Sequence, residues 1–112
     1  MIFTLAAMLL VPVEDQPFTI DQWAECGQIA LFRSESATGD IQKALLREAS
    51  DFFDKAGELQ FPGKELDEPE YEMLAERGHA RLQAQVRKVQ ASQMAQYANI
   101  TLLTCRVKIG RI

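Results

Sequence analysis

The fold of this chain depends most on residues 67–105, which read DEPEYEMLAERGHARLQAQVRKVQASQMAQYANITLLTC. Asp67 can accept backbone N–H groups at a helix start, and Pro69 suits the first turn, where its missing N–H is not needed. The glutamates around Pro69 are favourable at the positive end of the helix dipole. Beyond them, apolar and small residues recur with the three- and four-residue spacing of one helix face. This row comprises Tyr71, Ala75, Gly78, Leu82, Val86, Val89, Tyr97 and Ile100, with Gln93 as its one polar member.

This predicted helix is unusually long. Over residues 68–98 it would extend about 45 Å at ~1.5 Å per residue, whereas the mean helix has about 11 to 12 residues. We therefore expect a kink or break, with Gly78 and Asn99 as the candidate positions. Residues 100–109 hold enough β-branched side chains to form a strand. We favour helix there, because an edge strand would need a partner strand and the sequence offers none.

Two shorter helices are predicted upstream. Thr19 or Asp21 can cap the first, and its apolar face holds Trp23, Cys26, Ile29, Ala30 and Phe32. After a break over residues 34–39, Asp40 can cap the second, and Gly57 stands where a left-handed C-cap is expected. Its inward positions would be Ile41, Ala44, Leu45, Ala49, Phe52, Phe53 and Ala56, with Glu48, Asp51 and Lys55 facing outward. The sequence thus predicts an all-α fold, a small three- to four-helix bundle with one long C-terminal helix.

The packing of this bundle can also be predicted in part. Phe52 and Phe53 should pack against the long helix, because they are the largest apolar groups on the second helix. Their expected contacts are Leu82, Val86 and Val89.

The first residues of the chain differ from the rest. Residues 1–13 carry no charged side chain, and they are too few for the ~20 apolar residues of a membrane span but suit the apolar core of a secretory signal. No Lys or Arg precedes them, and no small-residue cleavage site follows. We expect residues 1–15 to be a signal peptide or apolar leader, and residues 16–112 to form one helical domain. A buried first element and an uncleaved anchor remain open.

Cys26 and Cys105 are the only cysteines. In an exported protein they should form a disulfide, and in the cytosol they would be two reduced core thiols. In a plain three-helix bundle with alternating directions they would lie at opposite ends. Either the long helix breaks to give four alternating elements, or the connection over residues 57–67 crosses the bundle. We prefer the crossover, which would explain the length of that connection.

The charges are segregated along the chain. Residues 1–76 hold all sixteen acidic residues and five basic ones, whereas residues 77–112 hold seven basic residues and no acidic one. These basic residues could pair with the acidic helices or bind an anionic partner. They are Arg77, Arg81, Arg87, Lys88, Arg106, Lys108 and Arg111. Nucleic acid is disfavoured as the partner, because the domain is not net basic and its aromatic residues cluster elsewhere.

Sites for catalysis or metal binding are weak in this sequence. Glu76 and His79 have the Glu-x-x-His spacing of carboxylate-bridged di-metal bundles, but one histidine cannot complete such a site. The acidic residues 65–72 lack the ligand order of a calcium-binding loop. No glycine-rich phosphate loop or nucleophile motif is present. We therefore predict no catalytic residue, no cofactor and no metal.

The expected function is that of a small, exported, disulfide-stapled helical protein in the periplasm or outside the cell. It would act as a non-enzymatic interaction or structural module for an unknown protein partner, with a homodimer left open. Membrane contact is expected only transiently, through the leader. The alternative is a module that binds an anionic ligand, either nucleic acid or anionic lipid, through the basic C-terminal third. A cytoplasmic location is the alternative to export.

Overall fold

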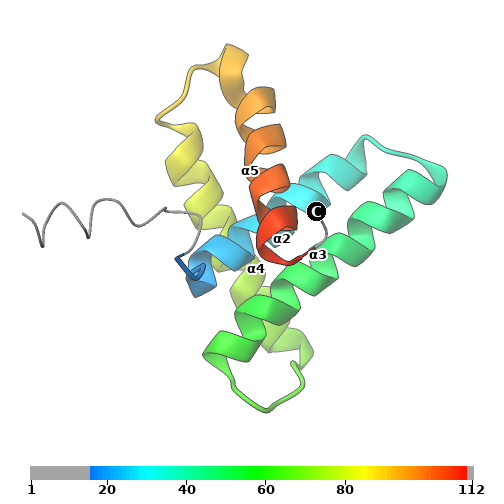
Figure 1. Ribbon diagram of the computed structural model, residues 1–112, viewed down its shortest axis with the longest axis vertical. Coiled ribbons are helices and arrows are strands. Elements are labelled where there is room, and N and C mark those ends of the chain that lie inside the picture. Colours follow the sequence, from blue (N-terminus) through cyan, green and yellow to red (C-terminus); the bar gives the residue numbers. More distant parts are fainter. Residues whose placement is uncertain (1–15, 111–112) are drawn as a thin grey trace, which may run out of the picture.

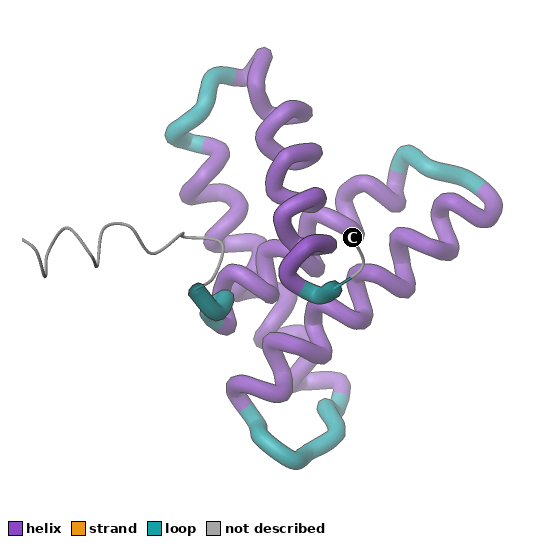
Figure 2. Tube along the Cα trace, viewed as in Figure 1, coloured by secondary structure: helices purple, strands orange, loops and turns teal. Residues whose placement is uncertain are grey.

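The computed structural model describes residues 16–110, which form helices joined by short connections and contain no strand (Figures 1 and 2). The elements within this part of the chain are α2 (Ile20–Glu35), α3 (Gly39–Gln60), α4 (Glu68–Val86), the 3-10 helix η2 (Ala91–Gln93) and α5 (Met94–Lys108). The all-α prediction is confirmed, and residues 100–108 are helical. The predicted leader, residues 1–15, and Arg111 lie outside the described residues.

The helices form two hairpins that cross each other (Figure 1). One hairpin consists of α2 and α3, which pack on each other. The other consists of α4 and α5, each of which packs mainly on α2. α2 is the central element, because it packs against each of the other three α-helices. None of the described helices is long and apolar enough to cross a membrane.

The helix starts are set by local hydrogen bonds. Thr19 and Gln22 form a capping box on α2, and Asp67 and Glu70 form one on α4, as the sequence predicts for Thr19 and Asp67. Asp40 does not cap α3. Thr38 occupies the cap position without a side-chain hydrogen bond, and Asp40 lies in the first turn, where its charge complements the helix dipole.

The predicted long helix is broken, but at neither expected position. α4 ends at Val86, Gln90 is extended (φ −72°, ψ 150°), and η2 precedes α5. The break brings the end of α5 back toward the start of α2, so the fold uses alternating hairpins rather than the preferred crossover. No glycine or proline marks residues 87–93, and tertiary packing therefore decides the break.

Gly78, an expected break position, and Gly57, an expected C-cap, have packing roles instead. Gly78 lies inside α4 against α2, and a Cβ on it would be 2.2 Å from the Ala24 carbonyl oxygen. Gly57 lies inside α3, which continues to Gln60, and a Cβ there would be 2.5 Å from the Leu66 side chain. Both glycines allow another segment to approach closely, and neither ends a helix.

The core lies mainly between α2 and α3. Trp23 is buried and stacks on Phe52, with ring centroids 6.2 Å apart, and the Phe53 ring lies against Gly27. The two phenylalanines therefore pack on α2. Of their expected contacts, Leu82 packs against the buried core, whereas Val86 lines an open hollow.

Several predicted faces differ from those observed. Ile41 and Phe32 are exposed although both were expected to face inward, and Glu48 is buried although it was expected to face outward. On α5 the buried residues are Ala98, Leu102 and Cys105, whereas Ile100 is 56% exposed. The break resets the helical phase, so the row of apolar residues does not continue from α4 into α5.

Candidate functional site

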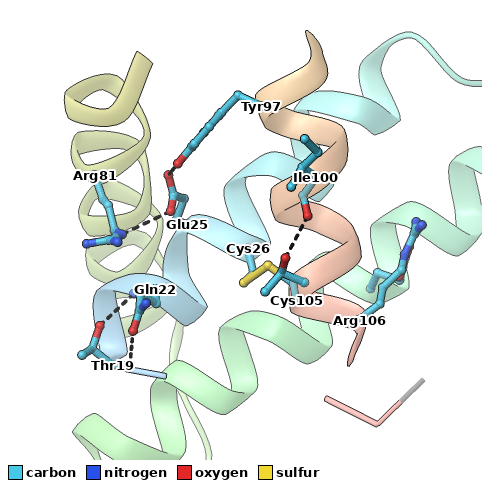
Figure 3. The surroundings of a disulfide bond; sticks show 11 residues. Thr19, Gln22, Glu25, Cys26, Arg81, Tyr97, Ile100, Cys105 and Arg106 are labelled. Carbon is cyan, nitrogen blue, oxygen red and sulfur yellow. Dashed lines mark hydrogen bonds and ion pairs between the residues drawn. A yellow bond between two sulfur atoms is a disulfide. The ribbon is translucent and has the colours of Figure 1, made fainter. Parts of the chain in front are cut away.

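A disulfide fixes α5 to α2. Cys26 and Cys105 are bonded, with their Cα atoms 6.0 Å apart, and both side chains are buried (Figure 3). The pairing predicted from the sequence is confirmed. The bond closes a chain segment of 79 residues, so it holds the two hairpins together at their crossing.

A buried carboxylate joins three helices beside the disulfide. Glu25 on α2 is next to Cys26, and its side chain is only 4% exposed. Its Oε2 accepts a hydrogen bond from the Tyr97 hydroxyl of α5 at 2.7 Å, and its Oε1 lies 3.2 Å from the Arg81 Nε of α4. Figure 3 shows both side chains pointing at this carboxylate. The three residues therefore set the separation of α4 and α5 across α2.

The same contact changes the titration of the phenol. Burial, together with the hydrogen bond to Glu25, raises the pKa of Tyr97 to about 12. Both effects favour the neutral phenol over a phenolate facing a carboxylate. Tyr97 therefore remains a hydrogen-bond donor throughout the physiological pH range.

An apolar hollow of about 340 Å³ lies beyond this contact, between the end of α4 and the start of α5. Ile29 and Phe32 of α2 contribute to it one turn apart. Phe32 is 58% exposed and Met94 is 40% exposed, so the hollow is open to solvent. Its lining consists of Ile29, Phe32, Leu82, Val86, Ala91, Met94, Ala95, Tyr97 and Ala98.

A second hollow of about 440 Å³ adjoins the first and is lined by more polar residues. The two share Phe32, Leu82, Val86 and Met94. The second adds the polar residues Gln28, Glu35, His79, Gln83 and Arg87. We call the two hollows together the Phe32 groove. Its apolar centre and polar edge are the usual composition of a protein interface.

Gln28 is an unusual member of this lining. Its Oε1 atom is buried, and no hydrogen-bond partner for it exists among the described residues. Buried polar groups in native proteins nearly always have a partner.

The six predicted basic site residues that the structure describes do not form one surface. Arg77 pairs with Asp21 at 2.7 Å, and Arg81 pairs with Glu25. Arg106 makes two hydrogen bonds to Glu48, at 2.7 and 2.8 Å, which raise its pKa above the usual value. The Lys108 ammonium donates to the Gln16 carbonyl and lies over the Phe18 ring.

Two of these six described residues remain without such a partner. Arg87 and Lys88 are exposed and make no ion pair with the described residues. They follow directly after α4, and Arg87 lines the Phe32 groove. Three of the six described cations therefore pair with carboxylates of the chain and Lys108 contacts a carbonyl, which leaves the anion-binding alternative with few free cations.

The described residues do not assemble a metal centre. No group of three or more His, Cys, Asp and Glu side chains among them could hold a metal ion. His79 is exposed at the edge of the Phe32 groove, and Glu76 is exposed on the same helix.

Sequence reasoning identified the disulfide but missed the groove. Phe32 was placed in the core, and Met94 was not singled out. A signal was present in α2, since its apolar residues occupy an arc wider than one buried face, with Trp23, Cys26 and Ala30 on one side and Ile29 and Phe32 on the other.

Another exposed apolar row lies on α5. It comprises Ile100, Leu103 and Val107, spaced three and four residues apart. These side chains border a hollow of about 350 Å³ that α5 alone lines, whereas residues of α2, α4, η2 and α5 line the apolar part of the Phe32 groove.

Comparison with known protein families, with curated proteins and with solved structures finds no match for this chain.

Proposed function

We propose that this chain is a small exported helical protein that binds another protein through the Phe32 groove and catalyses no reaction. The observation that carries the proposal is the solvent-facing Phe32, at the centre of an apolar surface with a polar edge. Exposed apolar patches with polar surroundings are typical of protein interaction sites, and aromatic side chains supply much of their binding energy.

Two features support a groove with a fixed shape. The disulfide and the Glu25 contact hold α5 against α2 directly below the groove. A preformed surface loses less conformational entropy on binding than one that must be ordered. The groove can therefore bind a partner without first reorganising its walls.

Export is supported by the disulfide and by the apolar residues at the start of the chain. Disulfides persist in oxidising compartments such as the periplasm and the extracellular space. Residues 1–13 have the composition of a secretory signal core. In the cytoplasmic alternative, both cysteines would be reduced.

Affinity capture from the native source tests the proposal. Three forms of the protein are compared: the parent, Phe32→Asp, and a matched control, Leu103→Asp, on the exposed row of α5. We expect one discrete partner with the parent and the control, and its loss with Phe32→Asp. If capture is lost with Leu103→Asp instead, the interface lies on the exposed row of α5. Intact mass in the same experiment reports removal of the leader and the loss of two hydrogens in the disulfide.

A further inference from the structure

We infer that the Phe32 groove binds an amphipathic helix of the partner protein, and that this helix carries an acidic residue opposite Arg87. The inference rests on the proposed function, because it names the partner of the same groove. It is carried by the charge at the edge of the groove and by the shape of its lining.

Most of the described basic residues after residue 76 already have a partner within the chain. Arg77, Arg81 and Arg106 each contact a carboxylate of this chain, and Lys108 donates to a backbone carbonyl. Arg87 and Lys88 have no such partner among the described residues, although every other described cation in this part of the chain has one. Because Arg87 lines the groove and Lys88 follows it directly in the chain, an acidic group on the occupant, opposite Arg87, is the complementary choice.

The lining indicates the form of the occupant. The two hollows lie side by side and share four apolar residues, so apolar side chains one helical turn apart could enter them in turn. An amphipathic helix presents such side chains at positions i, i+3 or i+4, and i+7. A compact small ligand is less suited, because small-molecule sites enclose most of the ligand surface and Phe32 and Met94 remain open to solvent.

The Gln28 side chain adds a polar requirement. Its unpaired Oε1 lies in the wall of the hollow that also contains Arg87. After a side-chain rotation into the hollow it can accept an N–H or O–H from the occupant. A partner helix with a polar donor between its apolar residues would satisfy it.

Selection from a phage library of random 16-residue peptides tests the inference, with the oxidised full chain as the target. Enriched peptides should share the helical apolar spacing and at least one flanking Asp or Glu. Phe32→Asp should weaken their binding at least about tenfold. Arg87→Glu should weaken it about fivefold and remove most of its salt dependence, whereas the control Arg47→Glu on α3 should not.

The outcomes separate the inference from the proposed function. Peptides that need Phe32 but lack an acidic residue, or bind the Arg87→Glu variant equally well, would overturn the inference and leave the groove as the interface. Uncharged apolar peptides resembling residues 1–13 would identify the chain's own leader as the occupant. A parent dimer that becomes monomeric with Phe32→Asp would identify a second copy. Binding that ignores Phe32 would overturn both proposals.

Discussion

The Tyr97 hydroxyl donates to the Glu25 carboxylate at 2.7 Å, although 72 residues separate them in the sequence. Glu25 precedes Cys26, so the hydrogen bond and the disulfide fix α5 to α2 at adjacent positions. The Phe32 groove begins on the other side of Tyr97, which contributes to its lining. The elements that stabilise the fold are therefore also those that shape the candidate interface.

Reduction of the disulfide should strongly destabilise the protein. In the chain-entropy model a bond that closes a segment of this length contributes about 4 to 5 kcal/mol. For a domain of this size, each kcal/mol shifts the melting temperature by about 4 to 8 °C. Thermal melts with and without reductant should therefore differ by more than about ten degrees. A melting temperature that does not change with reductant, or two titratable thiols in the native protein, would contradict the presence of the disulfide bond.

High pH should unfold the protein through its tyrosines. The pKa of Tyr97 is raised to about 12 by burial and by Glu25, and that of Tyr71 to about 12 by its hydrogen bond to Asp54. Because both pKa values are raised above that of an unfolded tyrosine, about 10, the stabilisation is complete below pH 10 and is lost as the pH rises toward 12.

Ultraviolet absorbance of the phenolate measures this titration directly. The parent should show almost no phenolate at pH 10.5, and denatured protein should show substantial ionisation at that pH. Tyr97→Phe and Tyr71→Phe separate the two contributions. Ionisation of both native tyrosines near pH 10 would rule out the buried contact with Glu25.

Gly78→Ala should destabilise the protein, although alanine is the better helix former. The new Cβ would be 2.2 Å from the Ala24 carbonyl oxygen, so α4 would have to move away from α2. We expect a loss of about 2 to 3 kcal/mol, measured by urea denaturation. The control is Ala80→Gly at an exposed position of the same helix, which should cost only about 1 kcal/mol. If Gly78→Ala were more stable than the parent protein, the close approach of α4 to α2 at this position would be contradicted.

Gln28→Met should stabilise the protein while impairing partner binding. Leaving a buried acceptor unpaired costs about 1 to 3 kcal/mol, and methionine of similar length removes that group. A higher melting temperature with weaker capture of the partner would indicate that Gln28 is kept for binding. A lower melting temperature would mean that its amide contributes to folding instead.

The sequence predicted local structure well where the determinants are local. The capping residues Thr19 and Asp67 act within a single turn, and the apolar positions Leu45, Ala49 and Phe52 follow the helical period. The disulfide was also predictable, because the chain contains only two cysteines. In each case the relevant residues are few or close together.

Features that depend on contacts between helices were not predicted. The break after Val86 has no local marker, and it shifted the buried face of α5 from Ile100 to Leu102. Glu48 is buried and pairs with Arg106, which lies 58 residues later in the chain. Phe32 looked like a core residue because periodicity does not show whether another helix covers that face.

The most direct test of the groove as the interface is photo-crosslinking in the cells that encode this chain. Benzoylphenylalanine is placed at position 32 in one variant and at position 103 in another, where Leu103 is exposed to a similar extent. The account predicts a discrete adduct with another protein from position 32 and none from position 103. An adduct from position 103 alone, or no adduct with another protein from position 32, would contradict it.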